Sequence, residues 1–131
     1  MAIRTGGRDD VSDSHVVWSH PTGGPYVCSP IHVNGRLYVI TEQGILTAYR
    51  ADTGKVIYRQ RLEGSFVSSP VAAAGHVYFS HDAGVTHVVK EGDAFTLVAS
   101  NSLEEQLLAS PAIAHGSLIF RTKHHLHRVG P

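Results

Sequence analysis

A Ser-Pro dipeptide and a following glycine recur along this chain about every 40 residues, and this repeat restricts the possible folds more than any other feature. Successive Ser-Pro pairs lie 40 and 41 residues apart, and each proline is followed by a glycine five positions later. The repeated columns are Ser29, Pro30 and Gly35; Ser69, Pro70 and Gly75; and Ser110, Pro111 and Gly116. Such self-similarity is typical of repeat architectures, in which each unit is one supersecondary structure and neighbouring units stack.

Each unit consists of short apolar stretches separated by glycine or aspartate turns, a pattern that predicts strands. The four strands expected in the first complete unit are residues 27–33, 36–41, 45–49 and 56–59. Four strands in about 40 residues is the content of one β-propeller blade. The predicted fold class is therefore all-β, built of blades with four antiparallel strands. Residues 103–108 could form a turn of helix, but a loop is predicted because the equivalent residues 63–66 read as a loop.

Two further columns predict how the blades pack. A column of small residues is expected where inner strands crowd around an axis, and a column of large apolar residues is expected between adjacent blades. The small column is Cys28, Ser68 and Ala109, and the large column is Tyr38, Tyr78 and Ile119. The glycine that follows each Ser-Pro is expected to adopt positive φ in a tight hairpin turn.

The strand count predicts a partial propeller of about three blades within one domain, residues 1–131. The expected parts are a linker (1–14), an outer strand of a preceding blade (15–24), two blades (25–64 and 65–105) and a last blade without its outer strand (106–131). Residues 16–20 could in principle fill the gap in the last blade. Three blades do not close a ring of the usual four to eight. The chain is therefore expected to be a fragment or to assemble with copies of itself, and its open faces favour a protein partner or self-association.

The stretch Ala48-Tyr49-Arg50-Ala51-Asp52-Thr53-Gly54-Lys55-Val56-Ile57-Tyr58 resembles the tryptophan-docking motif of the PQQ-like β-propeller repeat family. In that family the motif typically reads Ala-Leu-Asp-Ala-x-Thr-Gly-Lys-x-x-Trp. This chain keeps Thr53 and Gly54, but Arg50 replaces the usual Asp and Tyr58 replaces the docking Trp. Trp18, in the preceding strand, keeps the aromatic residue.

The end of the chain, from Ala109 to Leu126, is similar to the last blade of bacterial PQQ-like propeller proteins, a group that includes the outer-membrane assembly lipoprotein class. The resemblance covers about residues 16–129 and implies the C-terminal blades of a parent with about eight blades. It also implies a parent in the periplasm or at the cell envelope. The first residues of this chain do not form the apolar stretch of a secretory signal, so the location of the chain itself is left open.

Three functions are compatible with this resemblance. The favoured one is a non-catalytic binding or scaffold module for a protein or another ligand, which requires no catalytic residues and no cofactor. The second is a fragment of a quinoprotein dehydrogenase, which would hold PQQ with Ca²⁺ and use an Asp base with Glu and Asn metal ligands. The chain has a single cysteine and no recognisable motif of this kind, which weighs against an enzyme. The third is a sensor or substrate-binding domain of a larger envelope protein.

Composition excludes other classes of function. Eleven Lys and Arg balance eleven Asp and Glu, so the chain lacks the cationic excess of a nucleic-acid binder. No apolar run approaches the length of a transmembrane helix.

Few side chains stand out as site candidates. His125 and His127 would lie on one face of a strand and could share a metal ion, but a structural role is favoured because no carboxylate or thiolate is expected nearby to complete a site. Cys28 and the Ser-Pro serines are assigned structural roles, because each belongs to a repeat column. A binding face is predicted at the start of the inner strands, with Tyr26, Phe66 and Leu107 as its candidates.

Overall fold

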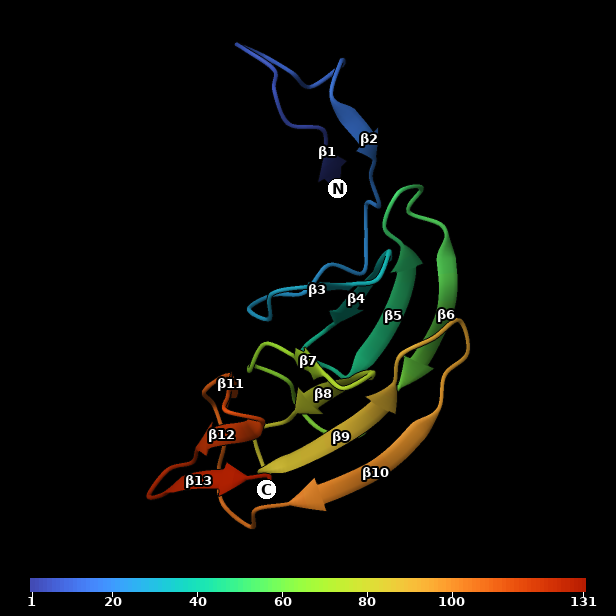
Figure 1. The fold of residues 1–131 in the computed structure, drawn as a ribbon. Helices are drawn as coiled ribbons and strands as arrows, with labels where there is room; N and C mark the ends of the chain where they lie inside the picture. The colour runs from blue at the N-terminus through green and yellow to red at the C-terminus, as the bar shows by residue number, and fades with distance from the viewer.

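The computed structural model describes all 131 residues and contains 13 strands and no α-helix. The strands form three consecutive antiparallel sheets that follow one another along the chain, preceded by a small N-terminal ribbon. This arrangement confirms the predicted all-β fold of propeller blades, left open as a partial ring (Figure 1). No helix is available that could span a membrane.

The first and second sheets are complete four-stranded meanders. The first sheet consists of β3 (Ile31–Val33), β4 (Arg36–Ile40), β5 (Ile45–Arg50) and β6 (Val56–Arg61). The second sheet consists of β7 (Val71–Ala73), β8 (His76–Ser80), β9 (Val85–Lys90) and β10 (Leu97–Ser102). In both sheets the strands pair in sequence order, so β3 and β7 form one edge and β6 and β10 the other (Figure 1).

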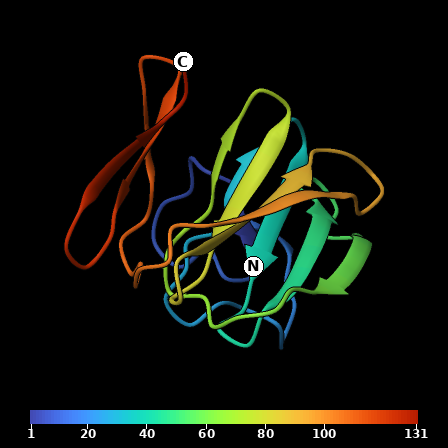
Figure 2. The ribbon, with the colours of Figure 1, turned by 90° about the horizontal axis from the view of Figure 1, so that it is seen from below.

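The third sheet has only three strands: β11 (Ala112–Ala114), β12 (Ser117–Arg121) and β13 (Leu126–Val129). Strand β13 pairs with β12 alone, so its outer edge is free. This sheet stands apart from the second sheet when the molecule is seen from below, where it is drawn in red (Figure 2).

The N-terminal ribbon differs from the sequence expectation. Strand β2 (Val16–Trp18) does not fill the gap in the third sheet but pairs with β1 (Ala2–Ile3), which lies in the segment expected to be a linker. The ribbon lies at the opposite end of the molecule from the third sheet (Figure 1), so β2 is too distant to complete it. Docking of Trp18 on the first sheet, described below, holds the ribbon there.

Each hairpin between the first two strands of a sheet has two consecutive residues with positive φ. The φ values are 45° and 77° for Asn34-Gly35, 50° and 73° for Ala74-Gly75, and 49° and 72° for His115-Gly116. Two central residues with positive φ define the type I′ turn, whose twist matches that of the flanking strands. The predicted role of Gly35, Gly75 and Gly116 is confirmed.

The main core lies between the first and second sheets. Its ten buried members are Cys28, Tyr38, Ile40, Leu46, Ala48, Leu62, Phe66, Val77, Phe79 and Val89. Alternate residues of each strand face this core, because successive side chains of a strand point to opposite sides. The large-column residue Tyr38 is fully buried here, and its hydroxyl accepts a hydrogen bond from the amide of Gly92 in the second sheet's outer turn (3.2 Å). The first two sheets are therefore tightly joined.

Candidate binding surfaces

The residues predicted to form one exposed binding face differ sharply in burial. Phe66 and Leu107 are each 0% exposed, whereas Tyr26 is 85% exposed. For Phe66 and Leu107 the prediction is therefore wrong. Each of these two packs beneath the preceding sheet, and its backbone amide donates to a carbonyl in that sheet's central turn, Phe66 to Glu42 and Leu107 to Asp82 (both 3.0 Å). Tyr26 occupies the same repeat column but has no preceding sheet above it.

The Ser-Pro serines connect neighbouring sheets. The amide of Ser29 donates to Oγ of Ser69 (2.9 Å), and the amide of Ser69 donates to Oγ of Ser110 (2.8 Å). The hydroxyl oxygens of Ser69 and Ser110 therefore each accept a hydrogen bond from a backbone amide of the preceding sheet. At the two ends of this ladder, the hydroxyl of Ser29 and the amide of Ser110 make no hydrogen bond.

Trp18 docks on the turn between β5 and β6. Its Nε1 donates to the carbonyl of Ala51 (2.9 Å), and its ring stacks on Tyr49 with centroids 6.1 Å apart. Gly54 lies so close that an added Cβ would be 2.5 Å from the indole ring. The glycine of the docking motif is therefore required by the close approach of Trp18.

Tyr58 docks on the second sheet in the corresponding way. Its ring meets Phe95 edge-on at 5.9 Å between centroids. Its buried hydroxyl has no hydrogen-bond partner, and burial raises the pKa of this phenol well above its usual value. Tyrosine thus fills the docking position but cannot reproduce the hydrogen bond that Trp18 makes.

Arg50, which departs from the motif, takes part in an ionic contact between the first two sheets. Its guanidinium lies 2.7 Å from Asp93 in the turn between β9 and β10, and Arg36 lies 2.8 Å from the same carboxylate. The hydrogen bond from Arg36, followed by the charges of both arginines, lowers the pKa of Asp93. Arg36 also contacts Glu91 at 3.4 Å. Solvent reaches this network, so it adds specificity to the contact more than stability.

The contact between the second and third sheets leaves an apolar cleft of about 560 Å³. Tyr78 and Val88 line its wall on the second sheet, and Leu118, Phe120 and Val129 line the opposite wall. Leu103, just after β10, also borders the cleft, and no strand of the third sheet stands opposite β10. The missing fourth strand therefore leaves this side uncovered.

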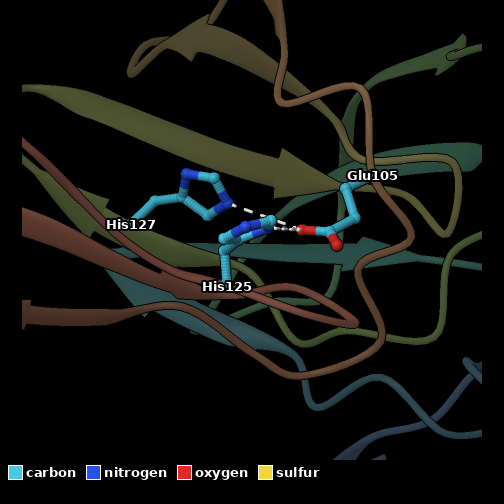
Figure 3. Close-up of side chains that lie close together, drawn as sticks. All are labelled: Glu105, His125 and His127. Carbon is cyan, nitrogen blue, oxygen red and sulfur yellow. Dashed lines mark hydrogen bonds and ion pairs between the residues drawn. The ribbon is translucent and has the colours of Figure 1, made fainter.

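The structure brings a carboxylate to the predicted histidine pair. Oε2 of Glu105 lies 3.0 Å from Nδ1 of His125 and 3.7 Å from Nε2 of His127 (Figure 3). The expectation that no carboxylate lies near these histidines is wrong, because the loop before β11 carries Glu105 to the turn between β12 and β13. The hydroxyl of Thr122 donates to Glu105, and this bond, together with those from His125 and the amide of His124, lowers the pKa of Glu105 to about 2.

The small column is buried only where another sheet covers it. Cys28 is 4% exposed and its thiol donates to the carbonyl of Phe66 (3.3 Å), while Ser68 is 2% exposed and its hydroxyl donates to the carbonyl of Ser80 (2.8 Å). Burial raises the pKa of the Cys28 thiol, which disfavours the nucleophilic thiolate. Ala109 is exposed, because no other sheet of the structure covers it.

Comparison with known families supports these interfaces as those of a propeller. The family model described as outer membrane protein assembly factor BamB matches residues 9–96. The chain belongs to this BamB family of PQQ-like propellers. The predicted resemblance is thus confirmed. No curated protein matches the chain in sequence.

Among solved structures, BamB from Moraxella catarrhalis is similar to this BamB-family chain, with a TM-score of 0.63 and 13% identity over 76% of the chain. KlHsv2 with its loop 6CD replaced by a Gly-Ser linker has a TM-score of 0.53 and 14% sequence identity over 75% of this chain. The computationally designed Ika4 protein has a TM-score of 0.57 and 9% sequence identity over 86% of this chain. The chain spans only 30% of the Moraxella protein and 33% of KlHsv2, but 96% of Ika4. At these identities the likeness concerns the fold alone.

Proposed function

We propose that this chain is a non-catalytic scaffold module that binds another propeller segment head to tail, with a second copy of the chain as the available partner. The observation that carries the proposal is the exposure of Tyr26 in a column whose other two members, Phe66 and Leu107, are fully buried beneath a preceding sheet. An exposed aromatic residue at a repeat position where the equivalent residues are buried is the expected centre of an interface.

The backbone around Tyr26 supports the same arrangement. Phe66 and Leu107 donate their amides to the central turn of the preceding sheet. In the third sheet the equivalent position in that turn is Lys123, whose carbonyl makes no hydrogen bond, and the amide of Tyr26 is likewise unpaired. A second copy placed after the third sheet would bring this amide to that carbonyl.

The serine ladder ends in matching groups. Each amide in the ladder donates towards the following sheet, so the free amide of Ser110 at one end suits the free hydroxyl of Ser29 at the other. The third-sheet end of one copy therefore complements the first-sheet end of another copy, whereas two like ends do not complement each other. Such an interface is heterologous, and repetition of it gives a ring or an open array.

The same placement would supply the missing strand of the third sheet. Strand β2 precedes Tyr26 and is paired on one side only, with β1. In a second copy docked through Tyr26, β2 would lie beside the free edge of β13, in the place that β6 and β10 occupy in the other sheets. Added strands of this kind combine main-chain hydrogen bonds with side-chain packing, and this one would cover the opening of the apolar cleft.

Light scattering during size exclusion tests the proposal over a range of micromolar concentrations. The chain is expected to have a mass that is a multiple of 14.1 kDa. Tyr26→Ala is expected to weaken association about tenfold or more, because it removes a large apolar surface from the interface. Its folded monomer should melt at the temperature of the unaltered monomer, since the Tyr26 side chain is exposed.

Leu97→Ala is the matched control, because Leu97 is also apolar and 44% exposed but lies on β10, away from the proposed contact. It is expected to leave association unchanged. A chain that stays monomeric throughout the concentration range, or equal association of the Tyr26→Ala variant and the unaltered chain, would overturn the proposal.

A further inference from the structure

Glu105, His125 and His127 have a geometry unlike that of the other polar clusters in the molecule. One ligand atom from each of the three side chains lies within 4.8 Å of both others. His127 lies in β13 and His125 directly precedes that strand, and the rings of these two residues, two positions apart, both face Glu105. The rings lie 5.8 Å apart between centroids, and Glu105 faces them from the loop before β11 (Figure 3).

From this arrangement we infer that Glu105, His125 and His127 bind a divalent transition-metal ion of the zinc type, which fastens the loop before β11 to the β12–β13 turn. Two imidazoles and one carboxylate are a known zinc ligand set that leaves a fourth position for water. Bonds of about 2.1 Å place the ligand atoms of a tetrahedral ion roughly 3.4 Å apart. The present separations of 3.0 and 3.7 Å from Glu105 bracket this value.

The hydrogen bonds around the cluster show a surplus of acceptor atoms. The single hydroxyl proton of Thr122 is within reach of Glu105, the carbonyl of His125 (3.1 Å) and Nε2 of His127 (3.0 Å). Without a metal ion, protons on the two histidine nitrogens must fill the space between these acceptors. A cation can replace those protons, because the same lone pairs that accept hydrogen bonds are the metal ligands.

The orientation of the Glu105 carboxylate is already fixed. Oε1 of Glu105 accepts from the amide of His124 (2.9 Å), which leaves Oε2 directed at the two histidines. The Glu105 and His127 side chains are 15% and 29% exposed, whereas that of His125 is 70% exposed and can move to the ion. Glu105 also lines a shallow hollow together with Asp82, Glu104 and Gln106, so solvent reaches this residue.

The repeat itself supports a specific role for these residues. In the two earlier units, Gly24 and Gly64 stand in the column of Glu105, and Gly44 and Gly84 stand in the column of His125. Both columns thus depart from glycine in the third unit alone, to a carboxylate and an imidazole that lie 3.0 Å apart. A general packing role would not require this particular pair.

Calorimetric titration with Zn²⁺ alone tests the inference on the intact chain. One Zn²⁺ is expected to bind per chain, and His125→Gln, His127→Gln and Glu105→Gln are each expected to weaken binding at least about 100-fold, since each removes a direct ligand. His124→Gln is the matched control. It removes a neighbouring exposed imidazole but keeps the backbone amide on Glu105, so it is expected to change affinity by less than about twofold.

Two measurements keep the test decisive although the chain has ten histidines. Imidazole nitrogen resonances of His125 and His127 should shift on addition of Zn²⁺, while those of the other histidines stay in place. His125→Gln should remain folded, because the side chain it alters is exposed. Absence of stoichiometric binding, or equal binding by His125→Gln, His127→Gln and the unaltered chain, would overturn the inference and leave Glu105 as a structural cap of the β12–β13 turn.

Discussion

The indole Nε1 of Trp18 lies 2.9 Å from the carbonyl oxygen of Ala51 and donates a hydrogen bond to it across 33 residues of chain. This bond, together with stacking on Tyr49, fixes the N-terminal ribbon to the first sheet. The hydrogen bond fixes the orientation of the indole ring in its apolar contact, because the indole can donate from only one position.

Replacement of Trp18 therefore tests the attachment of the ribbon. Trp18→Ala is expected to lower the free energy of unfolding by about 1–3 kcal/mol, through lost burial and one lost hydrogen bond. Trp18→Phe should lose less, since it keeps an aromatic ring against Tyr49. Chemical denaturation followed by circular dichroism measures both values, and proteolysis should cut residues before Trp18 faster in the Ala variant. Equal resistance to protease in both variants would argue against docking.

Substitution of Tyr58, unlike that of Trp18, is expected to raise the stability of the protein. Its hydroxyl is buried without a partner, so Tyr58→Phe removes a desolvated polar group while keeping the ring against Phe95. The variant is expected to be more stable by about 1 kcal/mol. The thermal melting temperature should rise accordingly. A decrease would show that the hydroxyl is hydrogen-bonded in solution, by water or by a shifted neighbour.

Two glycines with similar backbone angles should respond differently to alanine. Gly35 has φ of 77° and open space around an added Cβ, whereas Gly44 has φ of 83° and its Cβ would lie 2.2 Å from the carbonyl oxygen of Leu62. Gly35→Ala is expected to cost about 1–2 kcal/mol from the left-handed conformation alone. Gly44→Ala adds a backbone clash and should cost at least about 3 kcal/mol. Urea unfolding compares the two, and equal midpoints would contradict the clash.

His81 is expected to make stability depend on pH. Burial, and next the nearby His87, lower the pKa of His81 below its usual 6.5, although Asp82 at 3.6 Å acts in the opposite direction. The amide of Ala83 donates to its Nδ1, which suits a neutral ring. The unfolded chain therefore binds the proton more readily than the folded one. The contribution of neutral His81 is complete above pH 6.5 and is lost as the pH falls from there towards the lower folded pKa.

Equilibrium unfolding at several pH values measures this effect. His81→Gln should flatten the pH dependence below pH 6.5, because the variant has no group to protonate at this position. His32→Gln serves as the control, since it alters an exposed histidine on β3. Equal slopes in the His81 variant and the unaltered chain would assign the acid sensitivity to other groups.

Much of the fold follows from the repeat in the sequence. The glycine after each Ser-Pro pair indicated the tight hairpin turns, and the spacing indicated four-stranded sheets, because both depend on local conformation. Burial within a column could not be predicted, since Tyr26 and Phe66 are similar residues that differ only in whether a preceding sheet covers them. The same limit applies to β1, whose two residues form a strand only because β2 lies beside them.

The candidate metal site shows a second limit of sequence reasoning. Glu105 precedes His125 by 20 residues, and the two side chains meet only because the third sheet packs beside the end of the second. A signal was nevertheless present. Glu105 and His125 are the residues at which two glycine columns are broken, and in a repeat protein such paired exceptions point to a local contact.

The buried position of Cys28 makes its thiol a probe of transient opening between the first and second sheets. The only thiol of the chain is sealed between the first and second sheets, on the carbonyl of Phe66. A thiol reagent in solution cannot reach it until these sheets separate, so its labelling rate measures how often they part. The natural cysteine therefore allows the opening rate of the interface between the first and second sheets to be measured without a substitution.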